Sequence, residues 1–581
     1  MSVGKPPSAP ESSNLSASNR LESWKEIAAY LKRDESTVRR WEKEGLPVHR
    51  HVHKKKATVY AYQLDIDAWW NAGRAGLELP EAEAVGSRRR VAWWVVAGLL
   101  LLLPGVVGFN VGGARDRMLG RPVAGEITSL AVLPLENLSD NPERGDLAAA
   151  MTEELITELA KISALRVISR QSVMQYKGSK KPLGQIAQEL KVNAVVEGAV
   201  VRQGDRVSVM VQLIQVQPER HLWAERYDRD LTSILVLQRE VARAIAGEIR
   251  AKLTPQEQAL LANARAVNPE AYEAYLKGLY FMEKVNEEGI TKGIEYSRQA
   301  IGFDPTYAPA YVALADGYNR AAIHGYQPAK EAYPAAKAAV SRALQFGDTL
   351  SEAHVLAGVV KFRFDWDWTG AERDLKRALE LSPSSSRAHL GYSTYLLAMG
   401  RTDEAIQVAQ RNVELDPLTP QRHIDLAWKL SYAGRHDDAI TQLRKALELA
   451  PDSASAYGVL AENYAAKGMY AEAIAMCEKA LDLPFGGPEW SECGRVYVLA
   501  GRRRRALKLM QRMLAQSHVS PYQVARLYDA LGDRRQAFQW VVQAFETRAP
   551  EMCFLRIDPF SGDLRSDPRF QELLRRMNFP P

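Results

Sequence analysis

The stretch "KALELAPDSASAYGVLAENYAAKGMYAEAIAMCEKALDLP", residues 445–484, decides most of the fold. Its first seven residues return with small changes earlier in the chain. "RNVELDP" ends at Pro417 and "RALELSP" at Pro383, so that successive copies lie 34 residues apart. Pro305 lies further back, and Pro484 comes one residue short of the next step. A fixed period of 34 residues predicts stacked pairs of helices rather than one globular core.

The same period holds for the small, aromatic and turn residues inside each unit. They are Tyr457, Leu460, Ala461, Tyr464, Gly468, Ala473 and Ala480, then Ala427, Gly434, Ala439 and Ala446 one unit earlier, and Gly494, Gly501 and Ala506 one unit later. Small residues let two helices approach closely, and glycine permits the turn between them. The pattern is identified as tetratricopeptide repeat (TPR), with about eight units over residues 269–547. We expect an insertion near residues 321–333, an irregular unit near "FRFDWDW", and a polar-faced cap over residues 548–581.

A TPR solenoid has a concave inner surface that binds extended or helical peptides. Four polar residues fall on the first helices of their units and are candidates for this surface: Lys429, Asn463, Lys467 and Arg495. An ordinary solvated surface explains the same residues equally well. The array predicts protein or peptide partners without naming them.

Composition limits the remaining possibilities. The chain has 581 residues, 46% hydrophobic and 25% charged, which predicts several folded domains and argues against wholesale disorder. Residues 1–19, rich in Ser and Pro, are expected to be a disordered lead-in. The cysteines Cys477, Cys493 and Cys553 show no metal-binding spacing. We expect buried thiols, with a bridge between Cys477 and Cys493 left open.

The run "VAWWVVAGLLLLLPGVVGFNV", residues 91–111, contains no charged residue. A helix of this length spans roughly 31 Å at about 1.5 Å per residue, enough to cross a bilayer core. The three arginines at residues 88–90 and the tryptophans Trp93 and Trp94 are typical of a membrane boundary. The bias of positive charge predicts a single crossing of the inner membrane, with residues 1–90 cytoplasmic and the C-terminal region periplasmic. Residues 76–90 are expected to be a linker.

Residues 20–75 predict a small basic module. Residues 20–56 hold eleven Lys and Arg against six Asp and Glu. Ser23 and Glu26 form a capping box for one short helix, and Asp34 caps a second. Residues 48–53 and 57–62 alternate as two strands joined by lysines. Two short helices followed by a basic hairpin are the arrangement that major-groove binding requires.

This module resembles the winged helix-turn-helix of MerR and excisionase-type proteins. The resemblance implies that the second helix reads duplex DNA and that the wing grips its backbone, and degenerate copies that bind proteins also occur. The implied DNA-binding residues are Ser36, Thr37, Arg39, Arg40 and Lys43 on the helix, and Arg50, His51, Lys54, Lys55 and Lys56 on the wing. His49, His51 and His53 alternate and could share one face of a strand, but no carboxylate or thiol accompanies them, so we expect no metal site.

Residues 126–253 alternate between strand and helix patterns in the order β-α-β-α-β-β-(β)-α, which predicts an α/β domain with a mixed sheet. Gly204 and Asp205 mark a hairpin turn. The pieces "VLPLENLS", "ELITELA", "LRVISR" and "VVEGAVV" resemble the amino-terminal domain of TolB, which implies a non-catalytic module that contacts other proteins. Glu153, Glu154 and Glu158 form an acidic helix edge, which we expect to be solvated.

The sequence contains no phosphate-binding loop, HExxH or GxSxG motif, so we expect neither catalytic residues nor a cofactor. The whole chain is expected to be multidomain and mostly α-helical. Its layout resembles membrane-bound transcription factors of the ToxR and CadC kind, which predicts a one-component regulator with a DNA-binding head and an extracytoplasmic sensor. The alternative is an envelope TPR scaffold with a degenerate head. Homodimerisation, the DNA target and the signal stay open.

Overall fold

The computed structural model describes residues 20–42, 46–53, 56–71, 127–139, 147–249, 251, 253–262, 267–284, 286–483, 489–516, 519–560 and 562–580. These residues belong to two compact units divided after Gly120. The run 91–111 lies outside the described residues, as do residues 1–19 and 76–90, so the predictions for them stay predictions. Within the described ranges no helix has the length and apolar character needed to span a membrane.

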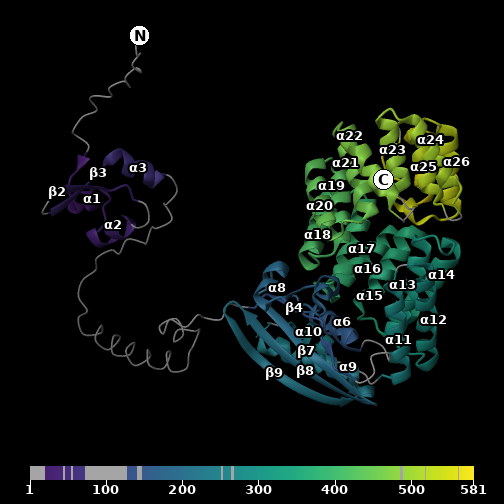
Figure 1. Cartoon of the computed structure of the whole chain (residues 1–581), viewed down its shortest axis with the longest axis horizontal. Coiled ribbons are helices and arrows are strands. Elements are labelled where there is room, and N and C mark those ends of the chain that lie inside the picture. Colours follow the sequence, from purple (N-terminus) through teal and green to yellow (C-terminus); the bar gives the residue numbers. More distant parts are fainter. Residues whose placement is uncertain are drawn as a thin grey trace, which may run out of the picture. The chain divides into compact units, whose positions relative to one another are not determined.

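The first unit, which we call the head, has three helices and three strands (Figure 1). They are β1 (Arg20–Leu21), α1 (Trp24–Tyr30), α2 (Glu35–Glu42), β2 (His49–His53), β3 (Lys56–Tyr62) and α3 (Gln63–Asn71). The strands pair antiparallel in the order β1-β3-β2. The two short helices and the hairpin agree with the sequence prediction, whereas α3 and the pairing of β1 with β3 were not predicted.

Local sequence explains where the two helices of the head begin. The Ser23 side chain accepts a hydrogen bond from the Glu26 amide, and Asp34 accepts one from the Thr37 amide at 2.9 Å. Both are N-cap contacts that satisfy amides left unpaired at a helix start. Val38 and Trp41 of α2 are buried. The apolar faces of α1 and α2 thus close a small core against the hairpin.

The second unit starts with the α/β domain. Its strands are β4 (Ser129–Val132), β5 (Glu136–Asn137), β6 (Arg166–Val167), β7 (Ala194–Gln203), β8 (Arg206–Val216) and β9 (Glu219–Asp230). Its helices are α6 (Leu147–Leu159), α7 (Arg170–Val173), α8 (Leu183–Leu190), α9 (Ile234–Glu248) and α10 (Pro255–Ala262), with short 3₁₀ turns at Met174–Tyr176 and Leu231–Ser233. The sheet has the order β6-β4-β7-β8-β9, and β5 also pairs with β7.

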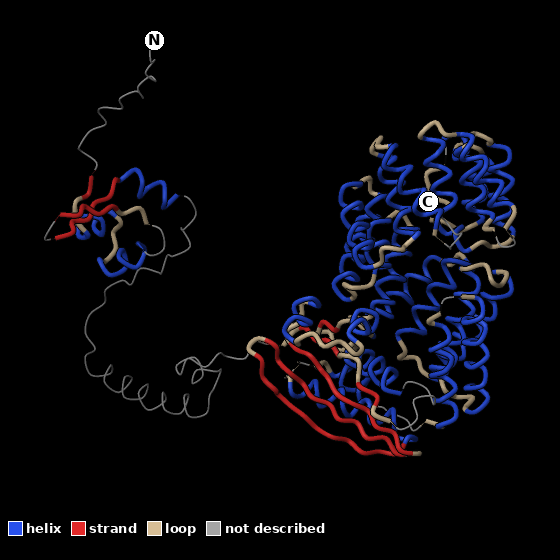
Figure 2. The backbone as a smooth tube through the Cα atoms, in the orientation of Figure 1, coloured by secondary structure: helices blue, strands red, loops and turns tan. Residues whose placement is uncertain are grey.

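The sheet is mixed, as predicted. β4 runs parallel to β6 and β7, whereas β7, β8 and β9 form the long antiparallel meander that Figure 2 shows in red. Gly204 and Asp205 turn the β7–β8 hairpin, with φ of +61° at Gly204. In β8, Val207, Val209 and Val211 are buried while Met210 between them is exposed. This alternation packs one face of β8 into the core and leaves the other open.

Eight helix pairs follow among the described residues, as the 34-residue period predicts. They are α11 (Pro269–Met282) with α12 (Glu287–Phe303), α13 (Ala308–Ile323) with α14 (Ala329–Phe346), α15 (Ser351–Val360) with α16 (Trp368–Leu381), α17 (Ser386–Ala398) with α18 (Thr402–Leu415), α19 (Pro420–Tyr432) with α20 (His436–Leu449), α21 (Ala454–Ala466) with α22 (Tyr470–Asp482), α23 (Glu489–Leu499) with α24 (Arg503–Leu514), and α25 (Pro521–Ala530) with α26 (Arg534–Glu546).

The glycine positions work as the sequence indicates. Gly434, Gly468 and Gly501 turn the chain between paired helices with φ between +71° and +76°, a conformation that glycine adopts without strain. The irregular unit near "FRFDWDW" contains a π-helical turn, Lys361–Asp365, followed by Trp366 with φ of +60°.

The chain ends with a 3₁₀ turn (Pro550–Phe554), α27 (Gly562–Arg565) and α28 (Pro568–Arg576). These elements do not merely cover the last repeat, as a polar-faced cap would. They fold back against α15–α19, and in Figure 1 the C label stands beside α23 rather than beyond the last repeat helix α26. The Trp368 indole donates a hydrogen bond to the Met577 carbonyl at 2.8 Å, although 209 residues separate them. The buried aromatic side chains of this segment explain the difference, because a polar cap would leave them exposed.

Candidate functional site

The head presents its cations from α2. Arg39 and Arg40 are exposed, and Arg40 has no side-chain partner among the described residues. Arg39 lies 5.2 Å above the Trp24 ring and 3.6 Å from Glu35, both weak exposed contacts. The two arginines are therefore available to an anionic ligand.

Ser36 and Thr37 were predicted to contact DNA, but in the structure their hydroxyls bind a carboxylate of the head itself. Thr37 donates from its hydroxyl to Asp34 at 2.8 Å, and Ser36 also donates to this carboxylate. These hydrogen bonds, with the Thr37 amide, hold the pKa of Asp34 well below its ordinary value. In the structure both hydroxyls bind Asp34, the residue that caps α2, so the contact that they would make with DNA stays a prediction.

The predicted wing is the β2–β3 hairpin. Arg50 pairs with Glu42 of α2 at 2.7 Å, which ties the hairpin to the second helix. Lys43, Lys54 and Lys55 lie outside the described residues, and the side chains of His51 and Lys56 are not described. Elsewhere, no group of three or more His, Cys, Asp or Glu among the described residues is arranged to hold a metal ion.

Two of the four groove candidates are buried. The Lys429 ammonium lies 2.6 Å from Asp425, and burial lowers its pKa against the attraction of that carboxylate. The Asn463 amide donates to the Val459 carbonyl and to Ser431, each at 2.8 Å. Asn463 therefore links α21 to α19, whereas Lys429 pairs within α19, and neither buried side chain presents a surface to a peptide. Lys467 is exposed and pairs with Asp437, whereas Arg495 is half-buried and pairs with Glu462 at 3.2 Å.

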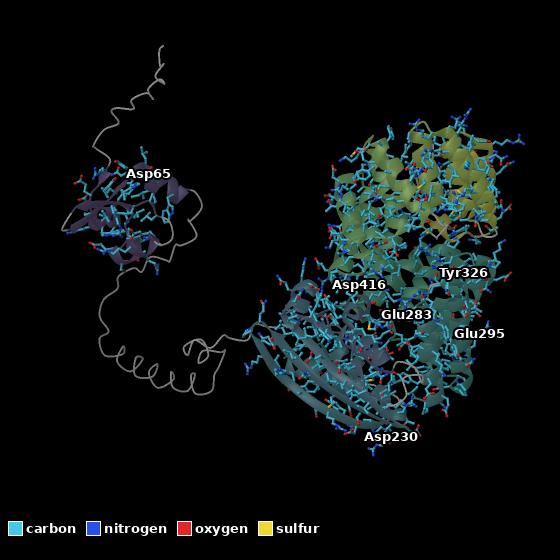
Figure 3. All side chains as sticks on the ribbon, in the orientation of Figure 1. Asp65, Asp230, Glu283, Glu295, Tyr326 and Asp416 are labelled. Carbon is cyan, nitrogen blue, oxygen red and sulfur yellow. The ribbon has the colours of Figure 1, made fainter. Side chains whose placement is uncertain are left out.

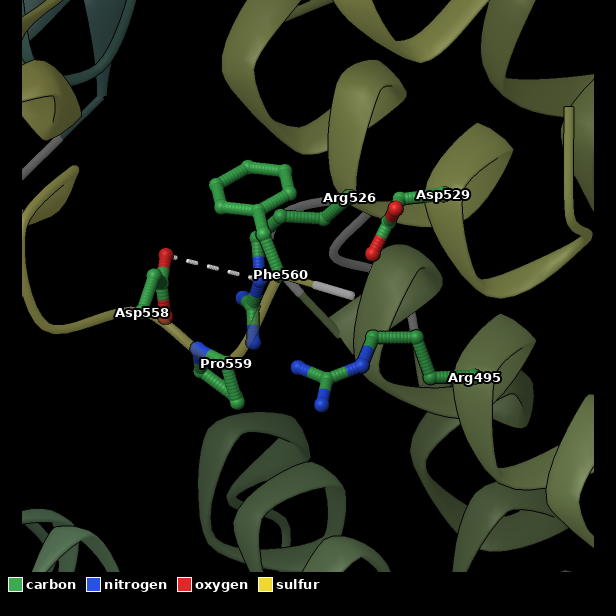
Figure 4. A pocket seen from close by; sticks show the side chains of 6 residues that line it. All are labelled: Arg495, Arg526, Asp529, Asp558, Pro559 and Phe560. Carbon is green, nitrogen blue, oxygen red and sulfur yellow. Dashed lines mark ion pairs between the residues drawn. The ribbon is translucent and has the colours of Figure 1, made fainter. Parts of the chain in front are cut away.

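The groove beside Arg495 is occupied by the chain itself. Tyr432 and Tyr522, from α19 and α25, both donate hydrogen bonds to the Asp558 carboxylate. Arg526 approaches the same carboxylate at 3.7 Å, and Figure 4 shows Arg495 and Asp529 at the edge of this pocket. Sequence reasoning missed this site because Asp558 lies outside the repeat period, and only the isolated "DPF" after the last repeat could have pointed to it.

A buried carboxylate adjoins this pocket. Glu492 on α23 is 4% exposed and lies close to Gly458 on α21, where an added Cβ would meet its Oε2 at 2.3 Å. Burial, then the charges of Glu462 and Glu489, raise the pKa of Glu492 well above its ordinary value. The direction of this shift reflects the cost of a third negative charge in this space.

The α/β domain occupies another part of the array. Asp416, in the turn between α18 and α19, accepts a hydrogen bond from the Ser172 hydroxyl at 2.7 Å and pairs with Arg422 at 3.1 Å. Arg422 in turn donates to Gln171. Figure 3 labels Asp416 and also Glu283, which pairs with Arg170 of the α/β domain. The first helix of the array packs into the same hydrophobic core as the sheet, which makes one continuous body.

We expected the acidic edge of α6 to be solvated, but part of it is buried. The Glu158 carboxylate is buried and pairs with Lys161 at 2.6 Å and Arg239 at 3.5 Å. Glu154 is half-buried, and burial together with the charges of Glu158 and Glu153 raises its pKa to about 8. The expectation failed because the edge turns toward the repeats rather than toward water.

The three cysteines are buried free thiols. The Cys493 thiol lies 3.9 Å from the Cys477 carbonyl. That contact and burial raise the pKa of Cys493, which makes it a packing residue rather than a reactive one.

Comparison with protein families identifies two parts of the chain. Residues 367–423 and 424–488 match tetratricopeptide repeat families, and residues 126–244 match the family described as HilA/YgeH-like transcriptional regulator, second domain. The chain therefore contains TPR repeats and a HilA-like regulator domain. The expected resemblance of this domain to TolB is not confirmed.

Similar proteins cover parts of the chain. A curated relative, putative adenylate cyclase 3 of Rhizobium meliloti (strain 1021), is 37% identical over 186 residues, which are 32% of each chain. The chain thus spans about a third of that relative. Among solved structures, PilF of Pseudomonas aeruginosa is 18% identical with a TM-score of 0.29, covering 44% of this chain and 97% of its own. YrrB, described as a TPR protein with an unusual peptide-binding site, is 20% identical with a TM-score of 0.25, covering 39% and 100%.

Proposed function

We propose that this chain is a one-component transcriptional regulator. Its head binds duplex DNA through α2, and the α/β domain with the repeats forms a sensing and protein-binding body. The observation that carries the proposal is the match of residues 126–244 to a domain of transcriptional regulators, downstream of a head with exposed arginines on its second helix. The proposal assigns the chain no catalytic step.

We also propose that residues 91–111 anchor the regulator in the inner membrane, with the head in the cytoplasm and the C-terminal region in the periplasm. The uncharged run and the arginines at residues 88–90 support this arrangement. A reporter enzyme that works only after export should be active when it is fused after residue 120. Activity of a reporter that works only in the cytoplasm would contradict the topology without touching the DNA-binding proposal.

DNA binding is tested on the full chain with duplex fragments at several salt concentrations. We expect affinity to fall steeply with salt, because cations on α2 release counterions from the phosphates. Arg39→Ala and Arg40→Ala should each weaken binding and reduce the salt slope by about 1 if they contact phosphate. Lys330→Ala and Arg373→Ala, exposed cations of the repeats, serve as controls. Absence of binding at 50 mM salt would end the proposal.

A second candidate is an envelope scaffold that assembles protein partners on its repeats. The pairing of Arg50 with Glu42 favours it, because one predicted phosphate contact is then occupied within the head. Crosslinking in cells separates the two candidates. Recovery of specific chromatin fragments supports the regulator, whereas recovery of envelope proteins alone supports the scaffold.

A further inference from the structure

Helix α24 differs in charge from the other outer helices of the array. Residues 499–516 contain six Lys and Arg and no Asp or Glu. The equivalent helices α18 and α20 carry both signs and pair them internally, as in Arg411 with Glu414 and Lys445 with Glu448. The basic charge of α24 is therefore local to one repeat.

Three of these six cations have no partner in the described part of the chain. Arg502, Arg504 and Lys508 are exposed and make no side-chain contact there. The other three are held. Arg503 donates to the Leu531 carbonyl at 2.7 Å, Arg505 pairs with Glu478 at 2.8 Å, and Arg512 lies 5.1 Å above the Trp490 ring. The unpaired cations leave an uncompensated positive surface.

Exposed leucines lie among these cations. Leu507 is 44% exposed and Leu514 is 41% exposed, seven residues apart on one side of α24, while Leu499 just before the helix is 58% exposed. The opposite side of α24 is already used, because Ala506, Leu509, Met510 and Met513 are buried in the array. None of the three leucines belongs to the hydrophobic core of the repeats that the described residues form.

We propose that the outer face of α24, formed by Leu499, Arg502, Arg504, Leu507, Lys508 and Leu514, docks on an anionic bilayer surface. Guanidinium and ammonium groups attract lipid phosphates, and leucines beside them enter the boundary between headgroups and acyl chains. A nucleic acid or an acidic peptide would engage the cations and leave the leucines in water. The bilayer is the partner that uses both kinds of side chain, which is why we choose it.

The test uses the full chain and a local probe, because the run 91–111 could bind vesicles by itself. An environment-sensitive fluorophore is attached through Gln511→Cys, at an exposed position of α24, while the three native cysteines are buried. Gln407→Cys at an exposed position of α18 is the matched control. With vesicles of phosphatidylglycerol and phosphatidylcholine that contain brominated lipid, we expect severalfold quenching at residue 511 and little at residue 407.

The quenching should be weak with pure phosphatidylcholine and should fall at high salt. Vesicle binding, measured by this quenching, should be weakened at least tenfold by Arg504→Glu with Lys508→Glu. Leu507→Ser with Leu514→Ser should weaken vesicle binding severalfold. Lys330→Glu with Arg373→Glu should not change it. The proposal is overturned by equal signals at residues 511 and 407, by no quenching with anionic vesicles, or by a response to duplex DNA that the leucine variants leave unchanged. None of these outcomes depends on whether the head binds DNA.

Discussion

At the scale of single residues, burial and neighbouring charges shift the pKa values of ionisable groups in the second unit. Glu154 and Glu492 are acids whose pKa burial raises, whereas Asp316 keeps a low pKa despite burial because Arg320 and Arg387 lie beside it. Such adjustments make stability depend on pH.

Glu154 gives the clearest dependence on pH. A glutamate in an unfolded chain ionises near pH 4.3, whereas Glu154 in the folded chain ionises at about pH 8. Between these values the folded state binds more protons, so the free energy of unfolding falls as pH rises through this window. Glu154→Gln should therefore raise the free energy of unfolding at pH 8 by roughly 1 kcal/mol or less, because the side chain is half-buried, and the melting temperature should rise with it. The gain should vanish at pH 4; an equal gain at both values would contradict this account.

Gly494 is a second test at this scale. A Cβ at this position would lie 2.5 Å from a Leu527 methyl carbon, so Gly494→Ala forces the buried Leu527 side chain or the helix α23 to shift. We expect a loss of about 1–3 kcal/mol in chemical unfolding. Gly302→Ala on α12, where an added Cβ meets nothing within 4 Å, should be neutral or stabilising. Equal effects of the two substitutions would rule out the contact as the cause.

At the scale of elements, the junction between the α/β domain and the repeats depends on one turn. Asp416 stands where the two adjacent units have Ser382 and Ala450, so neither neighbour places a carboxylate there. That carboxylate is fully buried between Ser172 and Arg422. The repeat at this position has been adapted to hold the domain.

Asp416→Ala should leave Arg422 buried without its counter-charge, a loss of roughly 3–5 kcal/mol. Because the contact spans the junction, faster proteolysis should appear on both sides of it. Glu414→Ala, which removes an exposed carboxylate two residues away, should change stability by less than about 0.5 kcal/mol. A destabilisation confined to the repeats would show that the junction does not depend on this pair.

Sequence predicted the repeats and the sheet well, because both repeat a local pattern. The prolines at 34-residue intervals and the turn at Gly204 are signals that neighbouring residues carry. The occupied groove has no such signal: Asp558 meets Tyr432 only after the whole array has turned back toward it. The prediction of Lys429 and Asn463 as ligand contacts failed for a similar reason. Burial of a polar residue depends on helices that are distant in sequence, so the local pattern does not show it.

At the scale of the whole molecule, the head and the larger unit are separate compact units. In the larger unit, parts of the chain itself cover surfaces of the repeat array. The α/β domain covers one part of the array and residues 550–580 cover another. We therefore expect a protein partner to contact mainly the outer surfaces of the repeats.

Phe570 of α28 is fully buried, and its substitution tests how far the packing of the C-terminal segment stabilises the repeats. Phe570→Ala should cost about 3–5 kcal/mol. Hydrogen exchange should accelerate in α15–α17 as well as in α28, because the C-terminal segment packs on those helices. Arg575→Ala, on the exposed side of α28, is the control and should leave exchange unchanged. Acceleration limited to α28 would mean that the two regions are independent.

The hydrogen bond between Trp368 and Met577 has a consequence for synthesis on the ribosome. Trp366, Trp368 and Phe362 leave the exit tunnel long before the residues that cover them, so the nascent chain holds an unfinished apolar surface while more than a hundred further residues are added. Closing so long a loop is slow, and chaperones bind such surfaces in the meantime. A premature stop anywhere before α28 would thus leave this apolar surface without its cover and expose the shortened product to degradation.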